Sequence, residues 1–300
     1  MIKTFFKLAL CIVVYTFINS VAGMVLPYSQ EFKNLRASGD PSAVIYVLIY
    51  AAIVCFTMFF IVRNTNYRGK KLFFHLVLIV FFITSFMMQI ETLAFGTAFP
   101  ALTRIDIVFF MIGALLAILA SAFLLVLFFQ NKKAVAAEDT AAAKDLAATV
   151  KKINIKSALI KLGIIGILYA GVYMFFGYFV AMRFEATRLF YTGSSANNVS
   201  VPLALPSQLL LVPFQIFRGI LFGVFTLPLV KMINSKTKLI ISICLVYLCP
   251  GMQLIIPNPL FPDMVRVAHL IEMTSSMLLF GVIVGNILWW EKTLKRGVDL

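Results

Sequence analysis

Charged side chains are scarce in this sequence. They make up 13% of the 300 residues, whereas a soluble domain carries about 25%. Hydrophobic residues reach 62%, and the mean hydropathy is +0.99. These apolar residues recur in runs of about 20, the length that spans a bilayer, rather than forming one core. The composition therefore excludes an ordinary soluble domain and predicts a protein that crosses the membrane several times.

Histidine and cysteine, the usual soft metal ligands, are also rare. The two histidines, His75 and His269, are predicted to lie on opposite sides of the membrane, so they cannot share a metal ion or a haem. The four cysteines all lie inside apolar runs without a Cys-x-x-Cys spacing, at Cys11, Cys55, Cys244 and Cys249. We therefore expect buried thiols, no disulfide framework, no metal site and no cofactor.

Eight apolar runs are present, and they predict an all-α, polytopic integral membrane bundle of about eight transmembrane helices. They cover residues 8–27, 43–62, 72–95, 107–129, 158–182, 209–230, 239–256 and 267–290. The first run is longer than the apolar core of about 7–15 residues in a signal peptide. We expect it to be retained as a helix rather than cleaved.

The positions of Lys and Arg predict which way the helices cross. With the N-terminus inside, the outer loops hold six of the 26 basic residues, and a seventh, Arg218, lies within the sixth run. The other 19 fall in the inner segments, as the positive-inside rule requires. The net charge of +14 thus reflects membrane orientation and indicates no nucleic-acid partner. We expect both termini to be cytoplasmic and the membrane to be a bacterial inner (plasma) membrane.

A long polar segment, 130–156, divides the chain, and similar residues recur on either side of it. Phe6-Lys7-Leu8, Tyr15 and Gly23 match Ile160-Lys161-Leu162, Tyr169 and Gly177 at a constant offset of 154 positions. Met88-Gln89-Ile90 and Met252-Gln253-Leu254 also correspond. We predict two four-helix halves, 1–130 and 157–300, joined by a cytosolic linker, 131–156, that is helical or flexible. Because four is even, the repeat would be parallel.

Four ionisable residues in or near apolar runs are candidates for a solute or ion pathway. Each costs about 2.5–3.5 kcal/mol at the centre of a membrane helix unless it finds a partner or water. Arg218 lies near the middle of its run, and Arg266, His269 and Glu272 share one face of the last helix because they are three residues apart. We hypothesise that Arg218 reaches Glu272 or Glu91, with Gln89, Gln215 and Gln253 completing a polar network.

The leading function is the binding or transport of a small solute or ion through an outer-facing cavity among helices three, four, six and eight. Glu91, Arg218, His269 and Glu272 would line this cavity. In a second hypothesis the protein is an enzyme acting on a lipid or lipid-linked substrate. A phosphate would then be held by Arg104, Arg183, Arg188 and Arg266, with Glu272 or Glu91 as base.

Two further interpretations require no solute. The charges would be structural ion pairs, or the chain would be a non-catalytic assembly partner of another membrane protein or of a second copy. Glycine pairs four residues apart, Gly219 with Gly223 and Gly281 with Gly285, allow close helix contact. They predict either packing of the sixth helix on the eighth or a dimer interface. The sequence does not identify a substrate, and whether the chain is an enzyme stays open.

Overall fold

The computed structural model describes residues 2–40, 42–96, 99–130, 155–192 and 208–296, and eight helices within them are long and apolar enough to cross a membrane. Seven are α1 (Ile2–Val25), α3 (Ala43–Asn64), α6 (Arg104–Phe129), α8 (Ile155–Phe179), α10 (Gln208–Met232), α11 (Lys236–Met252) and α12 (Asp263–Arg296). The third span consists of α4 (Gly69–Phe81), a π-helical segment (Phe82–Phe86) and α5 (Met87–Ala94). The prediction of an all-α membrane bundle is confirmed.

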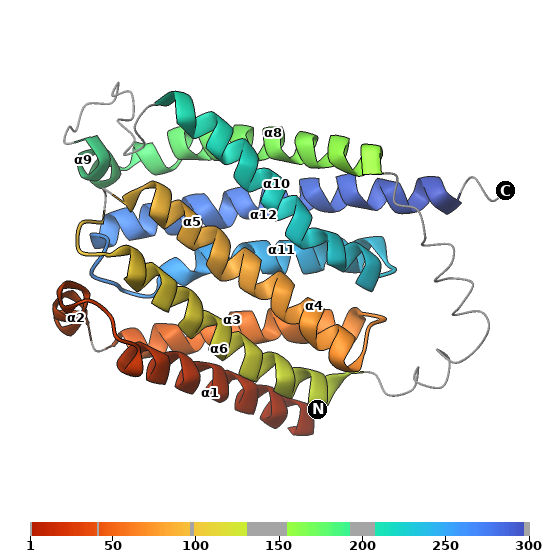
Figure 1. Cartoon of the computed structure of the whole chain (residues 1–300), viewed down its shortest axis with the longest axis horizontal. Helices are drawn as coiled ribbons and strands as arrows, with labels where there is room; N and C mark the ends of the chain where they lie inside the picture. The colour runs from red at the N-terminus through yellow and green to blue at the C-terminus, as the bar shows by residue number, and fades with distance from the viewer. Residues whose placement is uncertain (1, 41, 97–98, 131–154, 193–207, 297–300) are drawn as a thin grey trace.

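The long helices run side by side along the long axis of the molecule (Figure 1). The start of α1 and the end of α12 lie at one end of the bundle, which we call the terminal end. Two short helices, α2 (Gln30–Ala37) and α9 (Glu185–Thr192), lie at the opposite end, which we call the α2–α9 end. The linker 131–156 predicted between the halves lies, apart from its last two residues, outside the described residues.

The short helices were missed by the sequence analysis, because they are too short to show a clear apolar period. Segment 183–206 reads as an irregular loop, but residues 185–192 form α9. The other short helix, α2, begins at Ser29, whose hydroxyl accepts a hydrogen bond from the Phe32 backbone N–H. Asp106 of α6 accepts hydrogen bonds from both the Ser29 N–H and its hydroxyl at 2.7 Å, which ties the start of α2 to the bundle.

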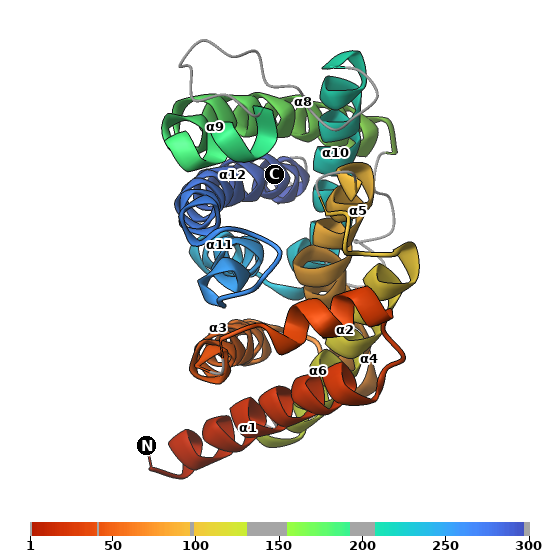
Figure 2. The same cartoon turned by 90° about the vertical axis from the view of Figure 1, so that its left-hand side faces the viewer.

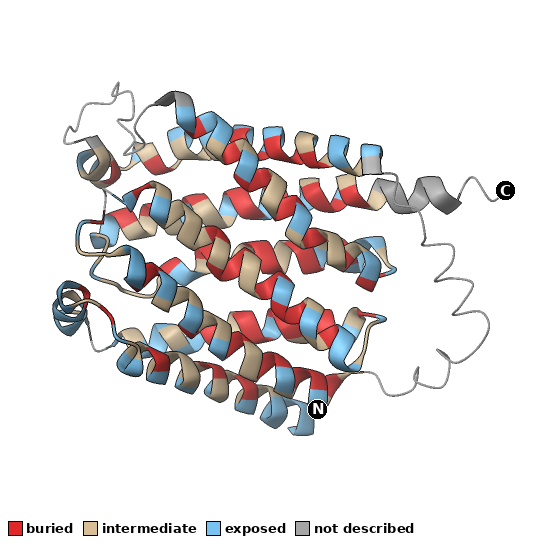
Figure 3. Ribbon diagram, in the orientation of Figure 1, coloured by how far each residue is buried: buried red, intermediate tan, exposed pale blue. Residues whose placement is uncertain are grey.

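The outer surface of the bundle carries large apolar side chains along its long helices. Phe17, Phe123 and Ile167 are each 58–63% exposed. Exposed and buried positions alternate along the helices in Figure 3, as expected when one side of each helix meets its neighbours and the other meets lipid. In water such a surface would be a large apolar patch. The exposed side chains therefore support the membrane assignment independently of helix length.

Glycines let two pairs of helices approach closely, but not the pair that the sequence suggested. A Cβ atom added at Gly219 would lie 2.5 Å from the Tyr169 Cβ and 2.8 Å from the Gly166 Cα, both on α8. A Cβ atom added at Gly281 would lie 3.0 Å from the Cys244 Cα on α11. The sixth span thus uses its glycine to pack on the fifth, and the eighth uses its glycine to pack on the seventh. Small residues mark close crossings but do not identify the partner helix.

The packing pattern of the first four spans recurs in the last four. In the first set, α1 packs on α3 and α6, and α4 packs on α6. In the second set, the corresponding helix α8 packs on α10 and α12, and α11 packs on α12. Contacts between the sets are also matched, because α3 meets α11 and α4 meets α10. Figure 2, viewed from the α2–α9 end, shows α1 and α8 at opposite edges. This correspondence supports the predicted parallel repeat, while the domain division itself stays a prediction.

The α8–α10 crossing predicts a sharp difference between two glycines on one helix. Gly166→Ala would place a Cβ atom 2.7 Å from the Ile216 carbonyl oxygen, whereas the Cβ of Gly163→Ala meets nothing within 4 Å. We expect Gly166→Ala to lower the free energy of unfolding by about 1–3 kcal/mol, the usual cost of overpacking. Gly163→Ala is the matched control and should leave it unchanged or slightly raised. Unfolding in bicelles measures both, and equal effects would show that the helices do not cross here.

Candidate solute site

A cavity of about 770 Å³ extends from the α2–α9 end into the middle of the bundle. Its wall includes Asp40 and Pro259 from the connecting segments at that end, and Tyr15 and Met277 from the interior of α1 and α12. Helices of both halves contribute to the wall. The volume lies in the range of small-molecule sites, about 300–1,000 Å³.

The third span changes its helical geometry where it borders the cavity. Residues Phe82–Phe86 form a π-helix, in which the backbone hydrogen bond reaches one residue further than in an α-helix. Thr84 and Ser85, within this segment, line the cavity, and Glu91 follows in α5. The wider turn rotates α5 relative to α4, so Glu91 does not face the direction that an uninterrupted α-helix would give it. Such segments are frequent at functional sites.

Arg218 is 1% exposed and is neutralised by Glu91 of the other half. Its Nη2 donates to the Glu91 Oε2 at 2.7 Å and to the Met87 carbonyl oxygen at 3.2 Å, and its Nη1 donates to the Gln215 Oε1 at 2.9 Å. Its Cζ also lies 5.6 Å from the centroid of the Tyr169 ring, within cation–π distance. Of the two carboxylates considered from the sequence, Glu91 contacts the guanidinium.

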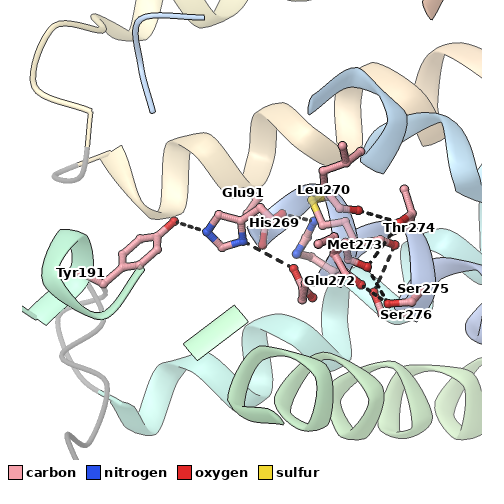
Figure 4. Close-up of polar contacts among 11 residues, drawn as sticks. Glu91, Tyr191, His269, Leu270, Glu272, Met273, Thr274, Ser275 and Ser276 are labelled. Carbon is pink, nitrogen blue, oxygen red and sulfur yellow. Dashed lines mark hydrogen bonds and ion pairs between the residues drawn. The ribbon is translucent and has the colours of Figure 1, made fainter. Parts of the chain in front are cut away.

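His269 and Glu272 form a second polar group on α12. The His269 Nδ1 lies 3.5 Å from the Glu272 Oε2, and the His269 Nε2 lies 3.0 Å from the hydroxyl of Tyr191 on α9. Figure 4 shows the three side chains in sequence, with the histidine between the other two. Burial, with a smaller effect of the Glu91 and Glu272 charges, raises the pKa of Tyr191. The tyrosine is therefore a neutral hydroxyl near pH 7 and a suitable hydrogen-bond donor to the imidazole.

Glu272 differs from Glu91 in its electrostatic surroundings. It is 7% exposed and lines the cavity, yet among the residues that the structure describes, no Lys or Arg lies within ion-pair distance of it. His269 is its ion-pair partner, and only when the imidazole is protonated. A buried carboxylate needs a cation, a hydrogen-bond donor or a proton. The cavity therefore contains a carboxylate that the protein itself balances only in part.

The glutamines expected around Arg218 are divided between two environments. Gln215 is buried and bonds Arg218, whereas Gln89 and Gln253 line the cavity. The Gln89 Oε1, Gln215 Nε2 and Arg218 Nε have no hydrogen-bond partner within the described part of the chain. Buried polar atoms are normally paired, so the Gln89 oxygen in the cavity wall is a position for water or for a polar group of a ligand. Gln215 and Arg218 are not among the residues that line the cavity.

The four arginines considered for holding a phosphate are used elsewhere. Arg266 and Arg188 donate to backbone carbonyl oxygens at helix ends, Arg183 lies over the Tyr178 ring, and Arg104 is exposed in the first turn of α6. None of the four is among the residues that line the cavity. The geometry brings Glu91, Arg218, His269 and Glu272 to one region of the bundle, and leaves these arginines outside it.

Sequence reasoning missed three parts of the site. These are Tyr191 on the unpredicted helix α9, the π-helical segment, and the tyrosine wall, by which we mean the cavity-lining residues Tyr15, Tyr50, Tyr169 and Tyr173. The wall had a partial signal, because Tyr15 and Tyr169, which matched across the repeat, both line the cavity. No group of three metal-ligating side chains is found within the described ranges.

No family model, curated protein or solved structure matches this chain.

The Arg218–Glu91 contact predicts strong coupling between the two positions. Glu91→Gln alone should cost about 3–5 kcal/mol of unfolding free energy, because it leaves the buried Arg218 guanidinium without its counter-charge. Arg218→Met alone should cost less, because Glu91 is 19% exposed and borders the cavity. The double variant should lose clearly less than the sum of the two. The same cycle between Arg218 and Glu272 is the control and should show weaker coupling. Additive losses for Arg218 and Glu91 would mean that the two side chains do not meet.

Proposed function

We propose that the protein binds a small solute in this cavity and transports it across the membrane. The observation that carries the proposal is a buried, incompletely balanced carboxylate, Glu272, in the wall of a cavity that lies between two four-helix sets. Ionisable groups within a membrane are costly and occur mainly where they pair or serve a pathway. Binding near the bilayer midplane, between structural repeats, is the arrangement of many secondary transporters.

Contacts between the halves towards the terminal end support access from the α2–α9 end only. Near the middle of the third span, the rings of Phe82 and Phe225 stack across the boundary between the halves, with centroids 4.2 Å apart. The Met232 carbonyl oxygen accepts hydrogen bonds from the Asn66 N–H at 2.8 Å and the Thr65 hydroxyl at 3.2 Å. A solute would reach the middle from one side and would pass on only after these contacts open.

The distribution of basic residues assigns the α2–α9 end to the outside. Both termini would then be cytoplasmic, and the host membrane would be a bacterial inner (plasma) membrane with the lipid bilayer as the permanent partner. The open side of the cavity would face the external medium. In this orientation the protein takes up an external solute or senses it.

An enzyme acting on a lipid-linked substrate is the second candidate, and one observation favours it. Val44 and Tyr178, close to the ends of α3 and α8, line the cavity and are 65% and 54% exposed, so we infer a cavity mouth wide enough for an amphipathic molecule. The arginines expected to hold its phosphate do not line the cavity. We therefore retain entry of an amphipathic molecule but favour binding or transport over headgroup chemistry.

Accessibility of the cavity from outside tests the proposal. In a variant lacking the four native cysteines, Ser20→Cys and Ser276→Cys place a thiol in the cavity wall, one in each half. The control, Ser121→Cys, replaces a fully buried serine that does not line the cavity. An impermeant thiol reagent applied outside should label the first two and not the third. Protection of all three in folded protein would contradict the proposal and favour a structural or assembly role.

A further inference from the structure

We infer that the solute is an organic cation with an apolar body, held by the Glu272 carboxylate and the faces of the cavity tyrosines. This inference rests on the proposed function and adds the chemical class of the ligand. Two observations support it: the charge balance around Glu272 and the tyrosine rings in the cavity wall.

The charge balance leaves one negative group for a ligand. Glu91 and Glu272 both line the cavity, and Arg218 is the fixed cation of the pair with Glu91. The titratable side chains that face Glu272 from neighbouring helices include Glu91 on α5, Arg218 on α10 and Tyr169 and Tyr173 on α8, together with Tyr191 on α9. Leaving His269 aside, these groups and Glu272 sum to one negative charge that a ligand cation would balance.

Aromatic rings from both halves surround the same space. Tyr15 and Tyr50 contribute from α1 and α3, and Tyr169 and Tyr173 contribute from α8. The face of an aromatic ring attracts a cation, more strongly when water is excluded. The Arg218 guanidinium already lies over the Tyr169 ring, so one of these rings is in contact with a cationic side chain of the protein itself. The faces of Tyr15, Tyr50 and Tyr173 are the candidates for a ligand cation.

The entrance of the cavity carries one charge of each sign. Asp40 lies in the cavity wall at the α2–α9 end, and hydrogen bonds from the Ser42 hydroxyl and N–H lower the pKa of its carboxyl. It is therefore ionised at neutral pH. Arg36, the basic residue at the same rim, donates to the carbonyl oxygen of Gly23, which also lines the cavity. The two charges offset each other, so the entrance does not distinguish a cation from an anion.

Two probe ions of the same shape and opposite charge test the sign of the ligand. Equilibrium dialysis of the full chain in lipid nanodiscs, with empty discs subtracted, measures the binding of tetraphenylphosphonium and, separately, tetraphenylborate. We expect saturable binding of the phosphonium only. Glu272→Gln should weaken it by at least about tenfold, the change that corresponds to about 1.4 kcal/mol. Glu185→Gln, which neutralises an exposed residue of α9 outside the cavity wall, should leave it unchanged.

A second pair of variants keeps the test valid if Glu272→Gln does not fold. Tyr173→Phe retains the aromatic ring and should retain binding, whereas Tyr173→Leu removes the ring and should weaken it. Equal binding of both ions, or preference for the borate, would overturn the cationic class while leaving solute binding intact. Binding of neither ion, with Ser276→Cys still labelled from outside, would overturn the inference alone. Failure of the proposed function would instead appear as protection of Ser276→Cys.

Discussion

The guanidinium of Arg218 sets the main electrostatic constraint on this protein. An unpaired arginine at this depth would be costly, and α10 offers it the Gln215 amide and the Phe214 ring but contains no carboxylate. Its balancing carboxylate, Glu91, comes from the third span, on the other side of the bundle's central boundary. The two four-helix sets are therefore joined by an ion pair as well as by apolar packing. Removing Glu91 leaves the buried guanidinium without a counter-charge, whereas removing Arg218 leaves Glu91 at the cavity wall.

The same pair explains why Glu272 is the distinctive residue of the cavity. Arg218 directs two of its polar contacts to the third span, through Glu91 and the Met87 carbonyl oxygen. Glu272, on α12, consequently depends on His269, which is bonded in turn to Tyr191 of the short helix α9. On the third span, the Glu91 carboxylate is balanced by Arg218. On α12, the Glu272 carboxylate has no arginine partner and is available to a ligand. Because Arg218 pairs with Glu91 across the halves, Glu272 is the carboxylate that we expect to bind the ligand.

Composition and run length were sufficient to predict the eight spans, because hydrocarbon requires about 20 apolar residues per helix. The cost of intramembrane charge also led us to select Arg218, Glu91, His269 and Glu272 as candidates, and their role in a site stays a prediction. The sequence left open whether Arg218 meets Glu91 or Glu272, since the rotation of each helix depends on packing and on the π-helical segment. Gly219 and Gly281 likewise marked close crossings without naming the partner helix. Tyr191 stayed hidden because α9 is only eight residues long.

The most direct test of the central claim is an experimental density map of the protein in a lipid bilayer, recorded without added ligand. The account predicts Arg218 against Glu91, and a cavity beside Glu272 that is open at the α2–α9 end and holds ordered water or solute. We also expect the hydrogen bonds from Asn66 and Thr65 to the Met232 carbonyl oxygen to join the two halves at the terminal end. Collapse of the tyrosine wall onto Glu272, with no water or solute beside the carboxylate, would contradict the account.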